Sequence, residues 1–275
     1  MPAVRDTCGG RLPQGDQREG MKVFAAKLSH ILGLQSYPVA VRFLAEVPDF
    51  EGFQKALKSR YCQALMRARR GECVYLMPDE ITCPAAASVL GFKPAPEKLR
   101  SGEMPAAYGI FGSPEAASHT IAGMPKLPMG KYKAVALAPL SSAPYAPDVV
   151  VIEAKAEQVM WLALASMYRA GGRHTFSSGV LQATCVDATI VPFLSGDVNM
   201  SFGCYGCREA TDMADDEGII GIPGGKLAEI GASLESLAEK AMPRVRSKNV
   251  YKMYIRPEGA PAGGHAGDPP GAPAQ

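Results

Sequence analysis

Two cysteines three positions apart are the sharpest chemical feature of the sequence. They are Cys204 and Cys207, within the segment GCYGCR (203–208). A turn between them brings both sulfur atoms round one centre, and its glycines relieve the steric limits on that turn. Such a pair can ligate zinc or an iron–sulfur cluster, or it can cycle between dithiol and disulfide. The alternative is a glycine-rich turn whose cysteines only pack against their neighbours.

One cysteine pair supplies two ligands, whereas a closed tetrahedral metal site needs four. Cys62 on a predicted helix and Cys83 at the start of another are the candidates that we choose to complete the site. The free N–H groups at a helix start are expected to lower the pKa of the Cys83 thiol. Cys185 lies inside an apolar segment, so we expect it to point into the core. The prediction is a metal site formed by Cys62, Cys83, Cys204 and Cys207, with core packing as the alternative for Cys62 and Cys83 taken singly.

One predicted helix is strongly basic, because it carries Arg60, Arg67, Arg69 and Arg70. Guanidinium groups bind carboxylates and phosphates bidentately. We therefore predict that Arg67 and Arg69, with Arg208 beside the cysteine pair, bind a small anionic ligand or an anionic redox partner. The alternative is a solvated helix face whose cations interact with the helix macrodipole.

Other polar segments carry weaker signals. A Cys–His–Asp arrangement of Cys185, His174 and Asp187 is conceivable, but the spacing has no diagnostic value. The acidic run 215–217 is more typical of a solvated loop than of a metal site. The glycine-rich segment 221–225 is more typical of a turn that enters a helix than of an anion site.

The elements that must position these residues alternate between helices and strands. Strands are predicted at 37–44, 72–77, 132–140, 147–154 and 249–255. Helices are predicted at 24–32, 60–70, 83–90, 114–122, 156–172, 179–194 as far as the turn before Pro192, and 227–241. This alternation predicts an α/β or α+β fold with a mixed sheet flanked by helices. The strands over 132–154 should be central, and the helix that follows is apolar all round, which predicts that Trp161 is buried against them.

Composition sets the organisation of the chain. The 275 residues fit one compact domain over 21–256 between segments 1–20 and 257–275, which lack apolar periodicity and are predicted to be disordered. The net charge of +2 gives no indication of a nucleic-acid or membrane partner. Without a secretory signal or an apolar run of about 18 residues, the expected location is the cytoplasm, where the seven cysteines stay reduced.

Three stretches together resemble one family. The resemblance covers roughly residues 22–243 and is to domain-of-unknown-function family 169, also called the ArCR family. It implies a single domain and a shared pattern that includes Cys62, Cys83, Cys204 and Arg208, but it implies no reaction. The stretches are CQALMRARRG (62–71) with CPAAASVLGF (83–92), then APL (138–140) with PDVVV (147–151) and QVMW (158–161), and then GCYGCR (203–208).

Function is therefore left between classes. The leading hypothesis is a cytoplasmic redox or metallocofactor protein whose clustered cysteines hold an iron–sulfur cluster or zinc. The alternative is a non-catalytic small-molecule binding module, and a third class is an interaction protein; in both of these the cysteines are incidental. The sequence decides neither the reaction, if there is one, nor the oligomeric state.

Overall fold

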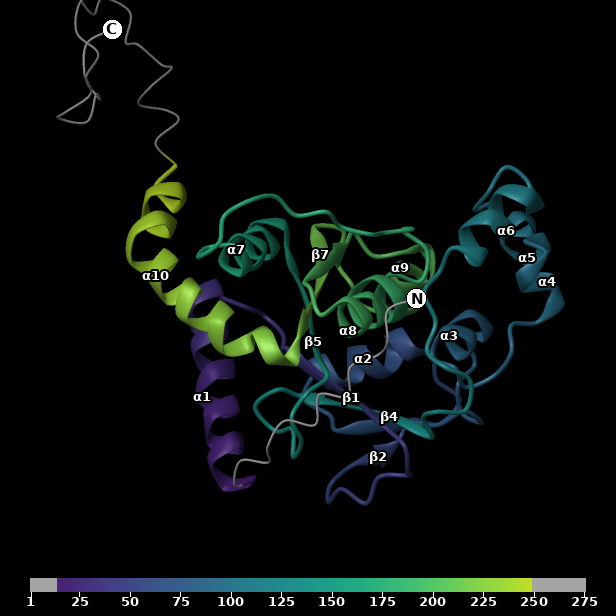
Figure 1. Cartoon of the computed structure of the whole chain (residues 1–275), viewed down its shortest axis with the longest axis horizontal. Coiled ribbons are helices and arrows are strands. Elements are labelled where there is room, and N and C mark those ends of the chain that lie inside the picture. Colours follow the sequence, from purple (N-terminus) through teal and green to yellow (C-terminus); the bar gives the residue numbers. More distant parts are fainter. Residues whose placement is uncertain (1–13, 249–275) are drawn as a thin grey trace, which may run out of the picture. The chain divides into compact units, whose positions relative to one another are not determined.

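The computed structural model describes residues 14–248, and a mixed sheet forms their centre (Figure 1). Seven strands of this part of the chain join in the order β2-β3-β4-β1-β5-β7-β6. β2 runs parallel to β3, and the other neighbouring pairs are antiparallel. The strands are β1 Val39–Leu44, β2 Gln54–Lys55, β3 Val74–Leu76, β4 Ala134–Pro139, β5 Val149–Lys155, β6 Asn199–Ser201 and β7 Glu217–Pro223.

The predicted central strands are confirmed. β4 is buried along its whole length and β5 up to Ala154. β1 lies between them, so that Val41 pairs with Leu137 of β4 on one side and with Val149 of β5 on the other. Both faces of these strands are covered, which accounts for their nearly continuous β-branched and alanine sequence.

Helices cover both faces of the sheet. α2 (Tyr61–Arg69) and a π-helix, η1 (Ala183–Ile190), share one core cluster with Val149 and Val151 of β5. α7 (Ala156–Ser166) packs on the opposite face, where Trp161 is buried as predicted. The prediction that α7 is buried all round is wrong, because Met160 on its outer side is exposed.

The π-helix approaches the sheet closely. Gly221 of β7 faces it, and a Cβ atom at Gly221 would overlap the carbonyl oxygen of Ala188. Before η1 the backbone enters the left-handed region at Val180 (φ 49°) and Gln182 (φ 62°), which L side chains rarely adopt. The prediction that the helix ends before Pro192 is wrong. Pro192 lies in the first turn of α8 (Val191–Ser195), a position that tolerates proline's missing N–H group.

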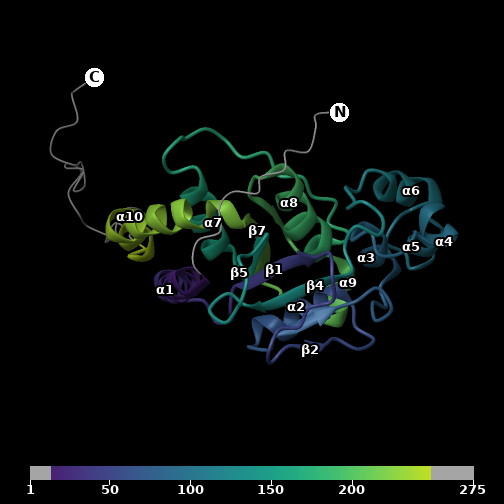
Figure 2. The ribbon, with the colours of Figure 1, turned by 60° about the horizontal axis from the view of Figure 1, so that its bottom comes forward.

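Three short helices form a helical cap that packs on α3 (Pro84–Val89). They are α4 (Glu97–Arg100), α5 (Glu103–Ala107) and α6 (Pro114–Ala122), and both views show them together beside α3 (Figures 1 and 2). Leu99 and Ile121 of this cap share a small apolar core with Ala85 of α3. The predicted helix 114–122 is confirmed, whereas α4 and α5 were not predicted.

Two further helices lie towards the chain ends. α1 (Gln14–Leu32) begins inside the segment 1–20, which was predicted to be disordered. The helix starts this early because Gln, Arg and Glu residues are good helix formers. The chain divides into two compact units between Glu235 and Ser236, within α10 (Leu227–Arg246), and the first unit contains the whole sheet. The predicted strand 249–255 and the segment 257–275 lie outside the described residues. No described helix combines the length and apolar composition needed to cross a membrane.

Candidate functional site

Five cysteines line one small cavity of about 40 Å³. Cys62 comes from α2, Cys83 precedes α3, Cys185 belongs to η1, and Cys204 and Cys207 come from α9 (Tyr205–Ala210) and the residue before it. The structure thus brings together all four predicted metal ligands. It adds Cys185, which is buried, as expected, but lines the cavity.

The shortest contact between two thiols lies within the cysteine pair. The sulfur atoms of Cys204 and Cys207 are 3.1 Å apart, and Cys207 Sγ lies 2.9 Å from the hydroxyl oxygen of Thr184. The thiol of Cys62 donates to the carbonyl oxygen of Gly206, the residue before Cys207, at 4.0 Å. Gly203 makes the turn before the pair possible, since its backbone has a φ of 83°.

Gln182 is a site residue that sequence reasoning missed. Its side-chain oxygen accepts hydrogen bonds from Cys185 Sγ at 3.2 Å and Cys83 Sγ at 4.0 Å. The sulfur of Cys83 in turn accepts a hydrogen bond from the amide of Ala86. No local sequence pattern marks Gln182, because its role depends on the left-handed backbone with which η1 begins.

Four thiols of this cluster, those of Cys83, Cys185, Cys204 and Cys207, are protonated at neutral pH. Burial raises the pKa of Cys83 and Cys185, and the hydrogen bond with Cys207, together with burial, raises the pKa of Cys204. Cys204 lowers the pKa of Cys207, but the hydrogen bond with Cys62 and burial outweigh this effect and raise it to about 11. The expectation of a lowered Cys83 pKa is wrong, because burial outweighs the hydrogen bonds from the helix-start amides. A metal ion would have to displace these protons.

The thiols do not surround a single point. Within residues 14–248, no group of three or more histidine, cysteine, aspartate or glutamate side chains is arranged to hold a metal ion. Coordination by four of these thiols would therefore require side-chain rotation around the cavity.

The three arginines predicted to bind an anion lie outside the cavity. Arg67 pairs with Glu72 on the surface. The guanidinium of Arg208 donates to the main-chain carbonyl oxygens of Phe202, Ala214 and Glu217. Arg60 instead lines the cavity, and it pairs with Glu209 at 2.7 Å.

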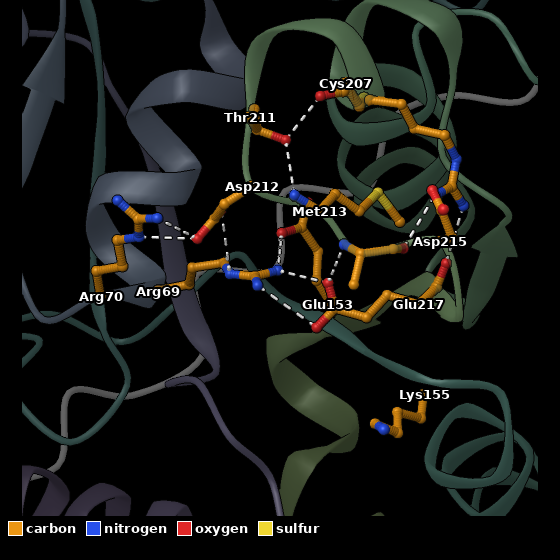
Figure 3. Close-up of polar contacts among 12 residues, drawn as sticks. Arg69, Arg70, Glu153, Lys155, Cys207, Thr211, Asp212, Met213, Asp215 and Glu217 are labelled. Carbon is orange, nitrogen blue, oxygen red and sulfur yellow. Dashed lines mark hydrogen bonds and ion pairs between the residues drawn. The ribbon is translucent and has the colours of Figure 1, made fainter.

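Arg69 lies at the centre of a buried ion-pair network beside the site (Figure 3). Its guanidinium contacts Glu153 at 2.5 Å and Glu217 at 3.2 Å, and its Nε lies 3.8 Å from Asp212. Glu217 therefore belongs to a strand and an ion-pair network, and the prediction of a solvated acidic loop is wrong for this residue.

This network extends to the cysteine pair. Asp212 follows Thr211, whose hydroxyl donates to the carbonyl oxygen of Cys207 at 2.7 Å (Figure 3). Arg70 also pairs with Asp212, at 2.6 Å. The arginines of α2 thus anchor the segment that follows the pair.

The conceivable Cys–His–Asp arrangement receives no support from the contacts of its members. His174 Nε2 lies 3.0 Å from the hydroxyl of Ser166 and 2.8 Å from the carbonyl oxygen of Ala163. The carboxylate of Asp187 accepts a hydrogen bond from Ser178. His174 is thus engaged at α7, while Asp187 stabilises the turn before η1.

A protein-family model, described as uncharacterised ArCR and domain of unknown function 169, matches residues 27–233. The chain belongs to the ArCR family. The uncharacterized protein MJ0308 of Methanocaldococcus jannaschii is 29% identical over 217 residues, which cover 77% of this chain and 92% of MJ0308. No solved structure matches the chain. The ArCR match includes every strand of the sheet and all five cysteines of the cavity, but the family description names no reaction.

Proposed function

We propose that the chain is a metallocofactor protein in which the five-cysteine cavity holds a thiophilic metal centre. The observation that carries this proposal is the meeting of thiols from α2, α3, η1 and α9 at one buried cavity. Cys62, Cys83, Cys204 and Cys207 are the proposed ligands. Cys185 is left out because its thiol donates to both oxygens of Gln182, at 3.2 and 3.6 Å, whereas Cys83 has only a 4.0 Å contact with that residue.

The size of the cavity favours a single ion. A water molecule occupies about 30 Å³ of the liquid, so 40 Å³ accommodates one metal ion with little else. Zinc suits this space, since four thiolates bind it in a closed tetrahedral site with bonds of about 2.3 Å. An iron–sulfur cluster is bulkier and would need the walls of the cavity to separate.

The charge of the cavity wall supports thiolate ligands. Four thiolates around a divalent ion leave an excess of negative charge. The guanidinium of Arg60 interacts electrostatically with Cys62 and Cys83, so it offsets part of this charge. A guanidinium keeps its own charge throughout the physiological pH range.

Anaerobic purification followed by metal analysis and a visible spectrum tests the proposal. We expect about one equivalent of a thiophilic metal, either as purified or after the reduced protein is titrated with Zn²⁺. Cys204→Ser should abolish this binding. Cys73→Ser is the matched control, because Cys73 is a half-buried thiol that does not line the cavity.

The proposal fails if the reduced protein, correctly folded by circular dichroism, neither contains metal nor binds Zn²⁺ or ferrous iron stoichiometrically. Equal metal content in the Cys204→Ser and Cys73→Ser variants would place any bound metal elsewhere. A brown protein that contains several irons would support a cluster in place of a single ion.

A redox dithiol is the second candidate function, supported by the 3.1 Å separation of the Cys204 and Cys207 sulfurs. Loss of two protons and two electrons to an oxidant such as diamide would join them in a disulfide. Mass spectrometry of the metal-free protein should then find the loss of two hydrogens at this pair, with Cys73 still reduced. Its absence under oxidant excess contradicts this candidate.

A further inference from the structure

A larger apolar cavity lies beside the cysteine cavity. Its volume is about 300 Å³, and α3, the helical cap α4–α6 and the residues that flank these helices form most of its walls. Its apolar lining includes Val89, Leu99, Met104, Ile121, Met124 and Leu181. Small-molecule sites in proteins are typically apolar cavities of about 300–1,000 Å³ with a few polar groups.

The two cavities share part of their walls. Arg60, Cys83, Gln182 and Gly206 line both of them. A molecule in the larger cavity therefore lies against Cys83 and the Gln182 side chain that accepts its hydrogen bond.

The charged groups of the larger cavity indicate the polarity of its ligand. Arg60 and Glu209 neutralise one another in an ion pair. Lys126 also lines the cavity, and it makes no ion pair with any residue between 14 and 248. Two exposed aromatic residues, Tyr108 and Tyr205, complete the part that faces solvent. Lys126 is therefore a cation without an ion-pair partner among the described residues, in a cavity that is otherwise mostly apolar.

We infer that this cavity binds a small molecule with an apolar body and one anionic group, and that it holds this molecule beside Cys83. A water molecule occupies about 30 Å³ of the liquid, so the chamber accommodates about ten non-hydrogen atoms. The anionic group pairs with Lys126, while the apolar body packs between α3 and the cap. Metal binding is not needed for this association.

Calorimetry of the full chain with octanoate as the probe tests the inference, with octan-1-ol and octylammonium for comparison. We expect octanoate to bind up to about fivefold more tightly than either, because only octanoate pairs with Lys126. Lys126→Ala should remove this preference. Lys133→Ala is the control, since Lys133 is exposed but does not line the cavity.

A second variant separates binding in this cavity from binding elsewhere. Met124→Trp should fill the cavity and abolish octanoate binding. If the Met124→Trp variant shows no thermal unfolding transition, Met104→Trp is used in its place. Bound octanoate should also slow the alkylation of Cys83 by iodoacetamide and leave that of Cys73 unchanged.

The inference would be overturned if octanoate does not bind, if its binding survives the tryptophan variant, or if the preference for octanoate survives Lys126→Ala. The titrations are done in the presence of a chelator. The test of octanoate binding is then independent of the proposed metal binding.

Discussion

Arg69 supplies the positive charge at the centre of the buried ion-pair network. Its side chain is 9% exposed and that of its partner Glu153 only 1%. Burial raises the pKa of Glu153, while Arg69 lowers it and so favours the ionised carboxylate. Without the guanidinium, this carboxylate would be left in the core with no cation.

We predict that Arg69→Met lowers the free energy of unfolding by about 3–5 kcal/mol, because it leaves a buried charge uncompensated. Urea denaturation followed by circular dichroism measures the change. Arg67→Met is the matched control on the same helix; its pair with Glu72 is largely exposed, so the expected loss is about 0–1 kcal/mol. Equal losses in the two variants would contradict the role of the buried network.

The raised thiol pKa values predict how metal affinity depends on pH. Cys204 and Cys207 hold protons at neutral pH that a metal ion must displace. Release of at least two protons makes the apparent affinity for Zn²⁺ rise roughly 100-fold per pH unit between about pH 6 and 8. Competition with a chelator of known pH dependence measures this slope. An affinity independent of pH would contradict thiol ligation.

At the scale of the elements, the contact of η1 with β7 decides where the Cys185 and Gln182 side chains lie. Gly221→Ala would place a methyl group against the Ala188 carbonyl, so η1 must move. We expect a loss of about 1–3 kcal/mol and faster alkylation of Cys185. Gly225→Ala is the control, because a Cβ atom there meets nothing within 4 Å. Unchanged stability and alkylation in Gly221→Ala would show that the helix is not held by this contact.

The strained turn before η1 gives a prediction of the opposite sign. Val180 is a β-branched residue with a φ of 49°, and it is 51% exposed, so little packing offsets the strain. Val180→Gly should raise the free energy of unfolding by about 1 kcal/mol. Val47→Gly removes a valine of similar exposure outside the left-handed region and should not stabilise the protein. Thermal denaturation of the two variants distinguishes the outcomes.

Strong local patterns were sufficient to predict several elements. The β-branched run 147–154 and the proline-started helix 114–122 carry their signals in neighbouring residues. β7 was missed because Gly218 and Gly221 interrupt its apolar pattern and are typical of a turn, although the close approach of η1 requires a glycine at 221. The very short β2, β6, α4 and α5 contain too few residues to establish a period.

The site was predictable as a set of residue types but not as a place. The spacing of Cys204 and Cys207 was enough to predict a cysteine pair. Its proximity to Cys62 and Cys83 could not be predicted, because it follows from the order of the strands and from the path of η1. The partners of Arg69 lie 84 and 148 positions away along the chain, so its buried role had no local signal. The same holds for Arg60, which pairs with Glu209 from 149 positions away.

At the scale of the whole molecule, the distribution of burial predicts which regions open most easily. The central strands β1, β4, β5 and β7 are largely buried. Segment 168–180 is mostly exposed and lacks regular secondary structure from Gly171 to Gly179. We expect hydrogen exchange to be slowest in these strands and fastest in this segment, because exposed backbone opens at little cost in free energy. Mass spectrometry of peptides from the native protein measures both, and equal protection would contradict this distribution.

The place of β1 in the sheet has a consequence for synthesis on the ribosome. Val39 of β1 pairs with Pro139 on one edge and with Val151 on the other. Both edges of β1 therefore stay unpaired until residues about a hundred positions later have been synthesised. Until those residues emerge, an apolar strand with open edges is available to other chains, which is the condition that favours aggregation. Folding of the nascent chain therefore depends on slow, long-range strand pairing. We expect chaperones to bind the nascent chain less once β5 has left the exit tunnel.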